Sequence, residues 1–222
     1  MSARPTDPRA AYDRPATEYY APLSAWRGHS HARRRARLLP RLEGRVLDIG
    51  CGDGRIALDA LGAQGFGVDS SAAMLGAARA RAAFARLARG DAHELPFRDA
   101  SFDTAIASHA LWLFAAPSLF LHEARRVLRP GGRLIVVSNQ PHYFAARAVV
   151  LAALTAAGRP HPEPAPQLHR RADVVAALAR GGFVELVSEG FLVAPVPGLE
   201  WLDRTPLARL GLSFLVEARK PR

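Results

Sequence analysis

Apolar segments alternate with stretches of helical periodicity along this chain, and that alternation predicts an α/β fold. The segments that indicate strands span residues 46–49, 66–68, 86–89, 102–107 and 134–138. The segments that indicate helices span residues 31–42, 56–61, 72–84, 117–128 and 172–180. Because nearly every position of 134–138 is apolar, we expect that strand to be central and parallel. Two last strands, 183–188 and 212–219, are expected to run antiparallel to each other.

A glycine-rich turn follows the first predicted strand, in the stretch R-V-L-D-I-G-C-G-D-G-R-I-A-L. Gly50, Gly52 and Gly54 carry no Cβ, so a ligand has room to lie against the backbone. A helix expected from near Arg55 would aim its free N–H groups at the same place. Asp48 puts a carboxylate where a bound cation or ammonium would sit. The stretch therefore predicts a nucleotide-type cofactor site at the carboxyl end of the first strand.

Acidic residues also follow the next two predicted strands. Asp69 lies 21 residues after Asp48, about where doubly wound folds hold ribose hydroxyls. Asp91 follows the third strand in the sequence Gly-Asp-Ala. Each acid alone would also suit a helix or turn cap. Three acids after three successive strands favour a shared edge of the sheet over capping alone.

Four motifs resemble the class I S-adenosylmethionine-dependent methyltransferases, especially the small-molecule branch called methyltransferase type 11. In family order and spacing they are D-I-G-C-G-D-G, G-V-D-S-S-A-A-M-L, G-D-A-H-E-L-P-F-R-D-A-S-F-D and L-R-P-G-G-R-L-I-V. The resemblance covers residues 41–137 well and the C-terminal strands loosely. It implies a Rossmann-like, seven-stranded, mostly parallel sheet with an antiparallel last strand and helices on both faces. It also implies one methyltransferase domain over residues 1–222, with a helical cover from the N-terminus.

The resemblance implies S-adenosyl-L-methionine as cofactor and a small, largely apolar organic acceptor, methylated on oxygen, nitrogen or carbon. The implied cofactor-binding residues are Asp48, Gly50, Cys51, Gly52, Asp69, Ser70, Met74, Asp91, Ala92 and Ser108. Asp69 would hold the ribose hydroxyls, and Asp91 would contact the adenine edge. Met74 would pack against the adenine, although it suits the core as well. For Cys51 we favour a small buried core position.

A sulfonium methyl group is already a strong electrophile, so a general base is optional in this chemistry. His109 follows the fourth strand and is our first candidate for a base or a substrate contact. A hydrogen-bonded structural histidine is the alternative at that position. His142 and Tyr143, just past the fifth strand, are the other catalytic candidates. The aromatic residues that would wall the acceptor site, or else fill the core, are Trp112, Phe114 and Phe144.

Residues 139–171 depart from the alternating pattern. An apolar, helix-like stretch over 141–157 is followed by prolines at 160, 162, 164 and 166. Prolines at alternate positions exclude a regular helix or a central strand. We interpret 139–171 as a lid insertion over the substrate side. At the other end of the chain, residues 1–12 are predicted to be disordered.

The composition and the net charge limit the kinds of molecule that this protein is expected to bind. The 222 residues suit one domain, and the net charge of +10 comes almost wholly from arginine, with Lys220 the sole lysine. A basic surface attracts nucleic acid or anionic surfaces, but no nucleic-acid recognition module is present, so we do not expect that partner. No apolar run of about 18 residues and no signal core occur. With Cys51 the only cysteine and the histidines scattered, we expect a cytoplasmic protein without a metal site.

Three other functions compete with this interpretation. A nicotinamide-dependent oxidoreductase would have a glycine at the position of Arg55. A nucleic-acid methyltransferase would often carry an Asn/Asp-Pro-Pro-aromatic turn where this chain reads S-H-A-L after the fourth strand. A catalytically decayed S-adenosylmethionine-binding protein would be expected to lose the glycine turn and its acids, which are intact here. The acceptor and the oligomeric state are not set by the sequence.

Overall fold

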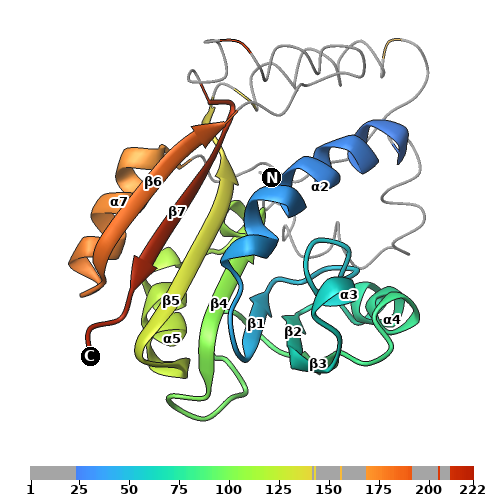
Figure 1. Ribbon diagram of the computed structural model, residues 1–222, viewed down its shortest axis with the longest axis horizontal. Coiled ribbons are helices and arrows are strands. Elements are labelled where there is room, and N and C mark those ends of the chain that lie inside the picture. Colours follow the sequence, from blue (N-terminus) through green and yellow to red (C-terminus); the bar gives the residue numbers. More distant parts are fainter. Residues whose placement is uncertain (1–23, 142, 144–155, 157–168, 192–204, 206–210) are drawn as a thin grey trace, which may run out of the picture.

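The computed structural model describes residues 24–141, 143, 156, 169–191, 205 and 211–222. Their strands form one seven-stranded sheet with the order β3-β2-β1-β4-β5-β7-β6 (Figure 1). The strands are β1 Val46–Ile49, β2 Gly65–Asp69, β3 Arg86–Arg89, β4 Phe102–Ser108, β5 Leu128–Asn139, β6 Val184–Phe191 and β7 Ser213–Arg219. The helices are α2 Ser24–Leu38, α3 Leu58–Leu61, α4 Ala72–Arg81, α5 Pro117–Val127 and α7 Arg171–Arg180. Short 3-10 turns are η3 Leu39–Arg41, η4 Gly62–Gln64 and η5 Leu111–Leu113.

The strand order confirms the predicted seven-stranded, mostly parallel sheet with an antiparallel last strand. β1 pairs in parallel with β2 on one side and with β4 on the other. β7 runs antiparallel to both β5 and β6. The chain therefore changes direction across the sheet at β1, where open α/β sheets leave a crevice at their carboxyl edge.

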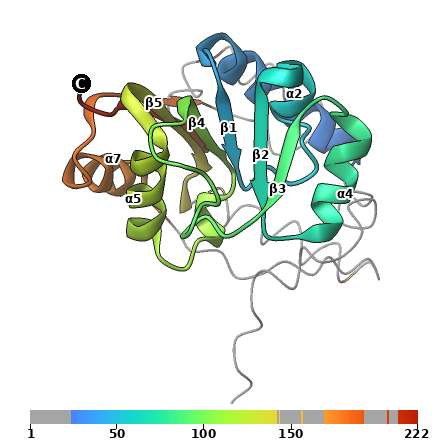
Figure 2. The same cartoon turned by 90° about the horizontal axis from the view of Figure 1, so that it is seen from below.

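Side chains alternate between two packed layers, because successive residues of a strand point to opposite faces. On one face, Leu38 of α2 packs with a cluster that includes Ile106 and Ile135. On the other face, Phe120 of α5 and Leu178 of α7 pack with a cluster that includes the neighbouring positions of the same strands. Figure 2 shows α2 on one side of the sheet and α5 and α7 on the other. The prediction of helices on both faces is confirmed.

Several predicted boundaries were wrong. α2 begins at Ser24 rather than at residue 31, and α4 ends at Arg81 rather than at residue 84. β5 begins at Leu128 because Leu128 pairs with Phe102 before the register shifts. The Arg-Pro-Gly-Gly stretch that we expected to separate helix from strand is thus an irregularity within β5, with Gly131 at a φ of 76°.

The predicted lid lies almost entirely outside the described residues, so it stays a prediction, as does disorder of residues 1–12. Within the described part of the chain, no helix has the length and apolarity that crossing a membrane requires.

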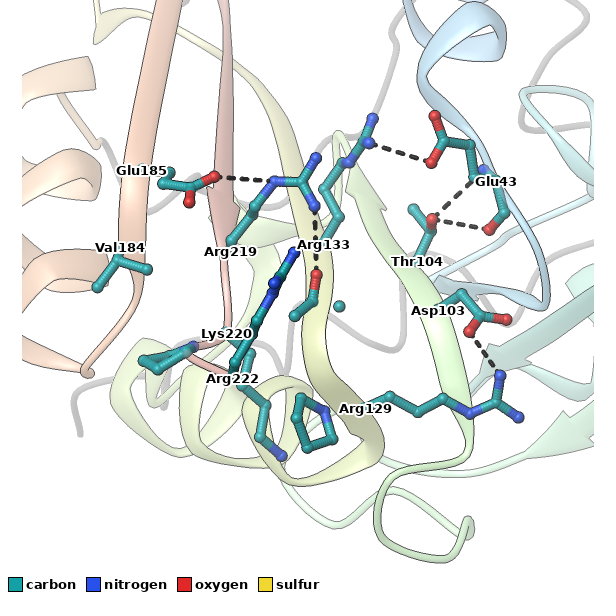
Figure 3. Close-up of a pocket in the computed structure, with 14 residues that line it drawn as sticks. Glu43, Asp103, Thr104, Arg129, Arg133, Val184, Glu185, Arg219, Lys220 and Arg222 are labelled. Atoms are coloured by element: carbon teal, nitrogen blue, oxygen red, sulfur yellow. Dashed lines mark hydrogen bonds and ion pairs between the residues drawn. The ribbon is translucent and has the colours of Figure 1, made fainter.

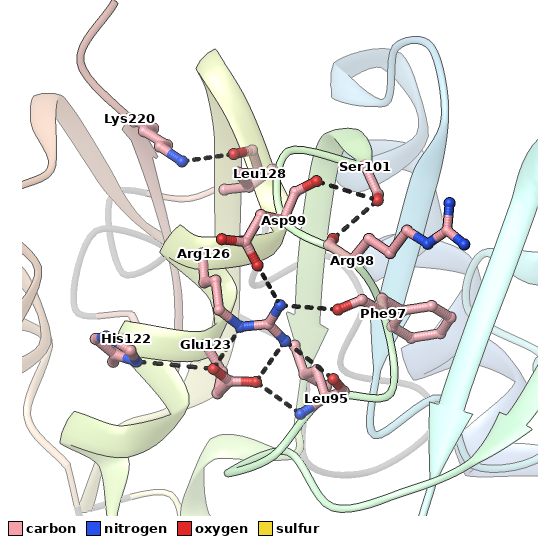
Figure 4. A network of polar contacts seen from close by, with 10 residues as sticks. All are labelled: Leu95, Phe97, Arg98, Asp99, Ser101, His122, Glu123, Arg126, Leu128 and Lys220. Carbon is pink, nitrogen blue, oxygen red and sulfur yellow. Dashed lines mark hydrogen bonds and ion pairs between the residues drawn. The ribbon is translucent and has the colours of Figure 1, made fainter.

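A buried ion pair on α5 holds the loop that connects β3 to β4 (Figure 4). Glu123 is only 8% exposed, and it accepts hydrogen bonds from the Arg126 guanidinium and from the Leu95 N–H at 2.8 Å. Arg126 also donates to the carbonyl oxygens of Leu95 and Phe97 and to the Asp99 carboxylate. The bond from Arg126, aided by that from Leu95, lowers the pKa of Glu123 despite its burial. This network fixes the Leu-Pro-Phe-Arg-Asp loop against α5.

We expect Arg126→Gln to reduce the free energy of unfolding by roughly 3 kcal/mol at pH 7, because it leaves a buried carboxylate without its cation. Because the folded-state pKa of Glu123 is lowered, this stabilisation is lost as the pH falls through that value, so the defect shrinks in acid. Urea unfolding at neutral and acidic pH measures both effects. The matched control is Arg125→Gln, at the exposed neighbouring position. Equal destabilisation by the two variants would contradict the role of the network.

Candidate cofactor site

The turn after β1 is tied to the neighbouring strand. The N–H groups of Gly50 and Cys51 both donate to the Val68 carbonyl, at 2.8 and 3.1 Å. Gly50 has a φ of 72°, and a Cβ there would come within 2.5 Å of the Ala110 Cβ. Glycine is required at this position both by the left-handed backbone and by the lack of space. The turn therefore passes tightly between β2 and the segment after β4.

The helix that we predicted from near Arg55 begins only at Leu58, so that expectation was wrong. Gly52 and Gly54 adopt left-handed φ values of 54° and 76°, which a right-handed helix does not accommodate. The Asp53 carboxylate also holds Arg55, accepting from its Nε at 2.9 and 2.7 Å. The N–H groups of Gly50, Gly52 and Gly54 in this turn donate to acceptors of the protein itself.

Asp69, at the end of β2, organises the polar groups around the turn. Its Oδ2 accepts from the Gly52 N–H at 2.8 Å, and its Oδ1 accepts from the Ser71 N–H at 2.9 Å. Ser71 caps α4, since its Oγ accepts from the Met74 N–H at 3.2 Å. Met74 itself is fully buried, whereas Ser70 is exposed. One carboxylate thereby joins the glycine turn to the start of α4.

Asp48 lies within β1, flanked by Gly67 of β2 and Ile106 of β4, and is 1% exposed. Burial, together with the nearby Asp69 carboxylate, raises the pKa of Asp48 to about 8. Its Oδ2 is buried and has no hydrogen-bond partner among the described residues. Buried polar atoms are almost always hydrogen-bonded in native proteins, so an orphaned acid here indicates a place for a ligand.

Two more orphaned polar atoms lie at the end of β4. The Ser108 Oγ and the His109 Nε2 are buried and also lack a partner among the described residues. His109 has a left-handed φ of 56°, and its N–H donates to the Val137 carbonyl at 2.7 Å. Burial lowers the pKa of His109 well below its usual range, and the charges of Arg34 and His31 lower it further. The imidazole is therefore neutral at pH 7.

Asp91, in the segment after β3, begins a chain of hydrogen bonds that runs through His93 to Ala116. Its Oδ1 accepts from the N–H of His93 at 3.0 Å and faces the His93 Nδ1 at 2.6 Å. The Ala116 N–H donates to the His93 Nε2 at 3.2 Å, so that nitrogen carries no proton and Nδ1 is the donor to Asp91. Ala92, next to Asp91, is buried against the core. His93 thus links the loop after β3 to the start of α5.

The remaining predicted residues are distributed as follows. Cys51 packs in a small apolar cluster with Leu58 and Leu75, and burial raises the pKa of its thiol. Tyr143 is buried, and its N–H donates to the Gln140 carbonyl at 3.0 Å. His142 and Phe144 lie outside the described residues. The catalytic roles of His109, His142 and Tyr143 therefore stay predictions.

Sequence reasoning missed several residues near the site. Asp53 is 2% exposed and pairs with Arg55 and, at 3.6 Å, with Arg81. His31 and Arg34 of α2 act on His109. The available signal was their spacing from Leu38, which puts all three on one helix face.

A groove of about 660 Å³ lies at the opposite, amino edge of the parallel strands (Figure 3). Its charged groups are largely paired with one another: Arg219 with Glu185 at 3.1 Å, and Arg133 with Glu43 at 3.2 Å. Lys220 donates to the Leu128 carbonyl at 2.7 Å. The groove is far from the carboxyl edge where Asp48, Ser108 and His109 gather. The bonds from Lys220 and Arg219 to carbonyl oxygens of β5 fix the end of β7 against that strand.

Comparisons with known proteins agree with this geometry. Residues 47–136 match the methyltransferase domain family. A ubiquinone/menaquinone biosynthesis C-methyltransferase of Roseobacter denitrificans is 39% identical over 110 residues, which cover 45% of this chain and 44% of that protein. A fatty-acid O-methyltransferase of Mycolicibacterium smegmatis is 35% identical over 105 residues, or 45% of this chain and 38% of that protein. The chain spans less than half the length of the curated relatives it matches.

The fold is shared over nearly the whole chain. A crystal structure described as a possible histamine N-methyltransferase from Thermotoga maritima superposes with a TM-score of 0.76 at 23% identity. The superposition covers 95% of this chain and 99% of that one, so the likeness shows a common fold. Residues 47–136 thus match the methyltransferase domain family, and they lie within a seven-stranded fold that this chain shares with a solved methyltransferase structure.

Proposed function

We propose that this protein transfers a methyl group from S-adenosylmethionine to a small organic acceptor. The observation that carries the proposal is the group of orphaned, buried atoms at one edge of the sheet: Asp48 Oδ2, Ser108 Oγ and His109 Nε2. The matched relatives include enzymes named for methylation at carbon and at oxygen, so they support methyl transfer without choosing the acceptor atom.

The residues at this edge fit the cofactor. S-adenosylmethionine carries an ammonium group, and a carboxylate that lacks a partner in the protein suits a cation. Asp48 would hold this group, and Asp69 at the end of β2 would hold the ribose hydroxyls. The buried Met74 and Ala92 would contact the adenine. These are the roles that the family resemblance implies, and the positions of the side chains support them.

When bound, the cofactor supplies a methyl group on a positively charged sulfur, which needs no further activation. The protein then has to orient the acceptor and keep water away. His109 is neutral and carries a lone pair on one ring nitrogen, so it is able to take the proton of an acceptor hydroxyl or of an activated carbon. The Ser108 hydroxyl is placed next to it in the chain and would help to orient the acceptor.

Calorimetry with S-adenosylhomocysteine, the demethylated product, tests cofactor binding directly. We expect binding by this ligand and none by reduced nicotinamide dinucleotide. No binding at millimolar concentration would refute the proposal. Methyl transfer from labelled S-adenosylmethionine to RNA or DNA, but to no small acceptor, would favour the nucleic-acid alternative. Binding without transfer to any acceptor would favour a decayed enzyme.

We expect the affinity for S-adenosylhomocysteine to rise with pH, by up to about tenfold per unit, until the pH reaches about 8. The cofactor-free protein holds a proton on Asp48, because burial raises its pKa, and pairing with the ligand's ammonium group favours the ionised form. Binding at pH 7 therefore releases a proton. Calorimetry in two buffers of different ionisation enthalpy counts that proton. Asp48→Asn should bind weakly and without this pH dependence; proton release by the variant equal to that of the wild type would contradict the assignment.

Asp69→Ala should weaken S-adenosylhomocysteine binding by well over tenfold, about the loss expected for a charged hydrogen-bond acceptor. Because Asp69 also holds Gly52 and Ser71, thermal unfolding of the variant is measured alongside. The control is Asp59→Asn, an acid on α3 that pairs with the Arg35 side chain. Wild-type affinity in the Asp69 variant would refute the ribose role.

A further inference from the structure

The connection between α4 and β3 exposes an aromatic side chain. Phe84 is 80% exposed, the most of any large hydrophobic side chain that the structure describes. It follows the end of α4 and precedes the start of β3, so it lies at the amino edge of the parallel strands, opposite the candidate cofactor site. Figure 2 shows α4 beside β3 at one end of the sheet. A single exposed apolar residue needs no explanation by itself, so its surroundings have to be considered.

The chain around Phe84 is rich in arginine and contains no acid. Residues 72–90 include arginines at 79, 81, 86 and 89, and they include no aspartate, glutamate, asparagine, glutamine, serine or threonine. The exposed positions of α4 other than its arginines are alanine and glycine. The surface on both sides of Phe84 therefore consists of cationic and apolar groups alone.

Arg45, the residue before β1, reaches the same edge. The guanidinium carbons of Arg45 and Arg86 lie 4.9 and 5.1 Å from the centroid of the Phe66 ring of β2. A contact with an aromatic ring orients a guanidinium without neutralising its charge. Both arginines are exposed, so their charges are available to a partner in solution.

Acids offset only part of this positive charge. Arg81 approaches the Asp53 carboxylate at 3.6 Å, but Asp53 is already paired with Arg55. Asp103, beside the start of β1, is likewise paired with Arg129 at 2.5 Å. The edge around Phe84 therefore keeps an excess of positive charge, which attracts anionic partners.

We propose that the surface formed by Phe84 with Arg45, Arg79 and Arg86 binds an anionic phospholipid bilayer. The arginines would contact lipid phosphates, and Phe84 would insert at the boundary between head groups and acyl chains. A bilayer fits these residues better than nucleic acid does. Proteins that bind nucleic acid stack bases on several aromatic rings or contact base edges with amide and hydroxyl groups. Residues 72–90 offer one aromatic ring and no amide or hydroxyl side chain.

This inference does not depend on the proposed function. Phe84 and its arginines lie at the amino edge of the sheet, whereas Asp48, Ser108 and His109 gather at the carboxyl edge. A bilayer bound at the amino edge would leave the cofactor site accessible from water. S-adenosylhomocysteine affinity should therefore be the same with and without vesicles.

Flotation of the full chain with lipid vesicles tests the proposal. We expect binding to vesicles of phosphatidylcholine and phosphatidylglycerol in equal parts, no binding to phosphatidylcholine alone, and release at about 1 M salt, where charges are screened beyond about 3 Å. Phe84→Ala should weaken binding about tenfold, the effect of no longer burying one large apolar side chain. The matched control is Leu119→Ala, which removes an exposed apolar side chain from α5 and should bind like the wild type.

Arginine variants locate the surface. Arg79→Gln combined with Arg86→Gln should weaken binding about 25-fold, since each arginine near an anionic membrane contributes roughly fivefold. The matched control combines Arg125→Gln with Arg180→Gln, which removes two exposed arginines from α5 and α7 and should have little effect. No binding to the mixed vesicles, equal binding to both vesicle types, or equal losses in the two arginine pairs would overturn the inference. Binding to an RNA oligonucleotide that is tighter than to vesicles and depends on Phe84 would also overturn it, in favour of nucleic acid.

Discussion

The two hydrogen bonds that the Val68 carbonyl accepts from the turn after β1 are the constraint on which the site depends. They hold Gly50 and Cys51 against the end of β2. Gly50 there has a left-handed backbone conformation and lies beside Ala110. Asp48 is 1% exposed beneath this turn, and the Asp69 carboxylate accepts from the Gly52 N–H. A single backbone acceptor thus determines where both carboxylates lie.

The polar groups at the two edges of the sheet differ in whether the protein itself supplies their partners. At the amino edge, arginines pair with acids or carbonyl oxygens of the protein, as for Arg133 and Arg219. At the carboxyl edge, Asp48, Ser108 and His109 each keep a buried atom without a partner among the described residues. Orphaned buried groups destabilise the folded protein. The gathering of three such atoms at the carboxyl edge is the physical argument that this edge is built for a ligand, whereas the paired charges at the amino edge stabilise the fold.

The carboxyl edge has two neighbouring regions, which differ in the titratable group that they hold. Around β1 and β2, burial, together with the nearby Asp69 carboxylate, makes ionisation of Asp48 unfavourable at pH 7. Around the end of β4, burial and the charges of α2 keep His109 neutral at pH 7. In the proposed function, the first region would hold the cofactor, and the second would face the acceptor.

The sequence by itself determined the order of the strands and helices, the glycine turn and the placing of acids near the ends of three strands. Those features depend on residues a few positions apart, so local periodicity and backbone preferences reveal them. Only the tertiary structure decided that Asp48 loses its water, that Asp53 is buried, that Glu123 and Arg126 clamp the loop before β4, and that α2 brings Arg34 to His109. Burial and the interaction of charges depend on which distant elements pack together, and no short stretch of sequence contains that information.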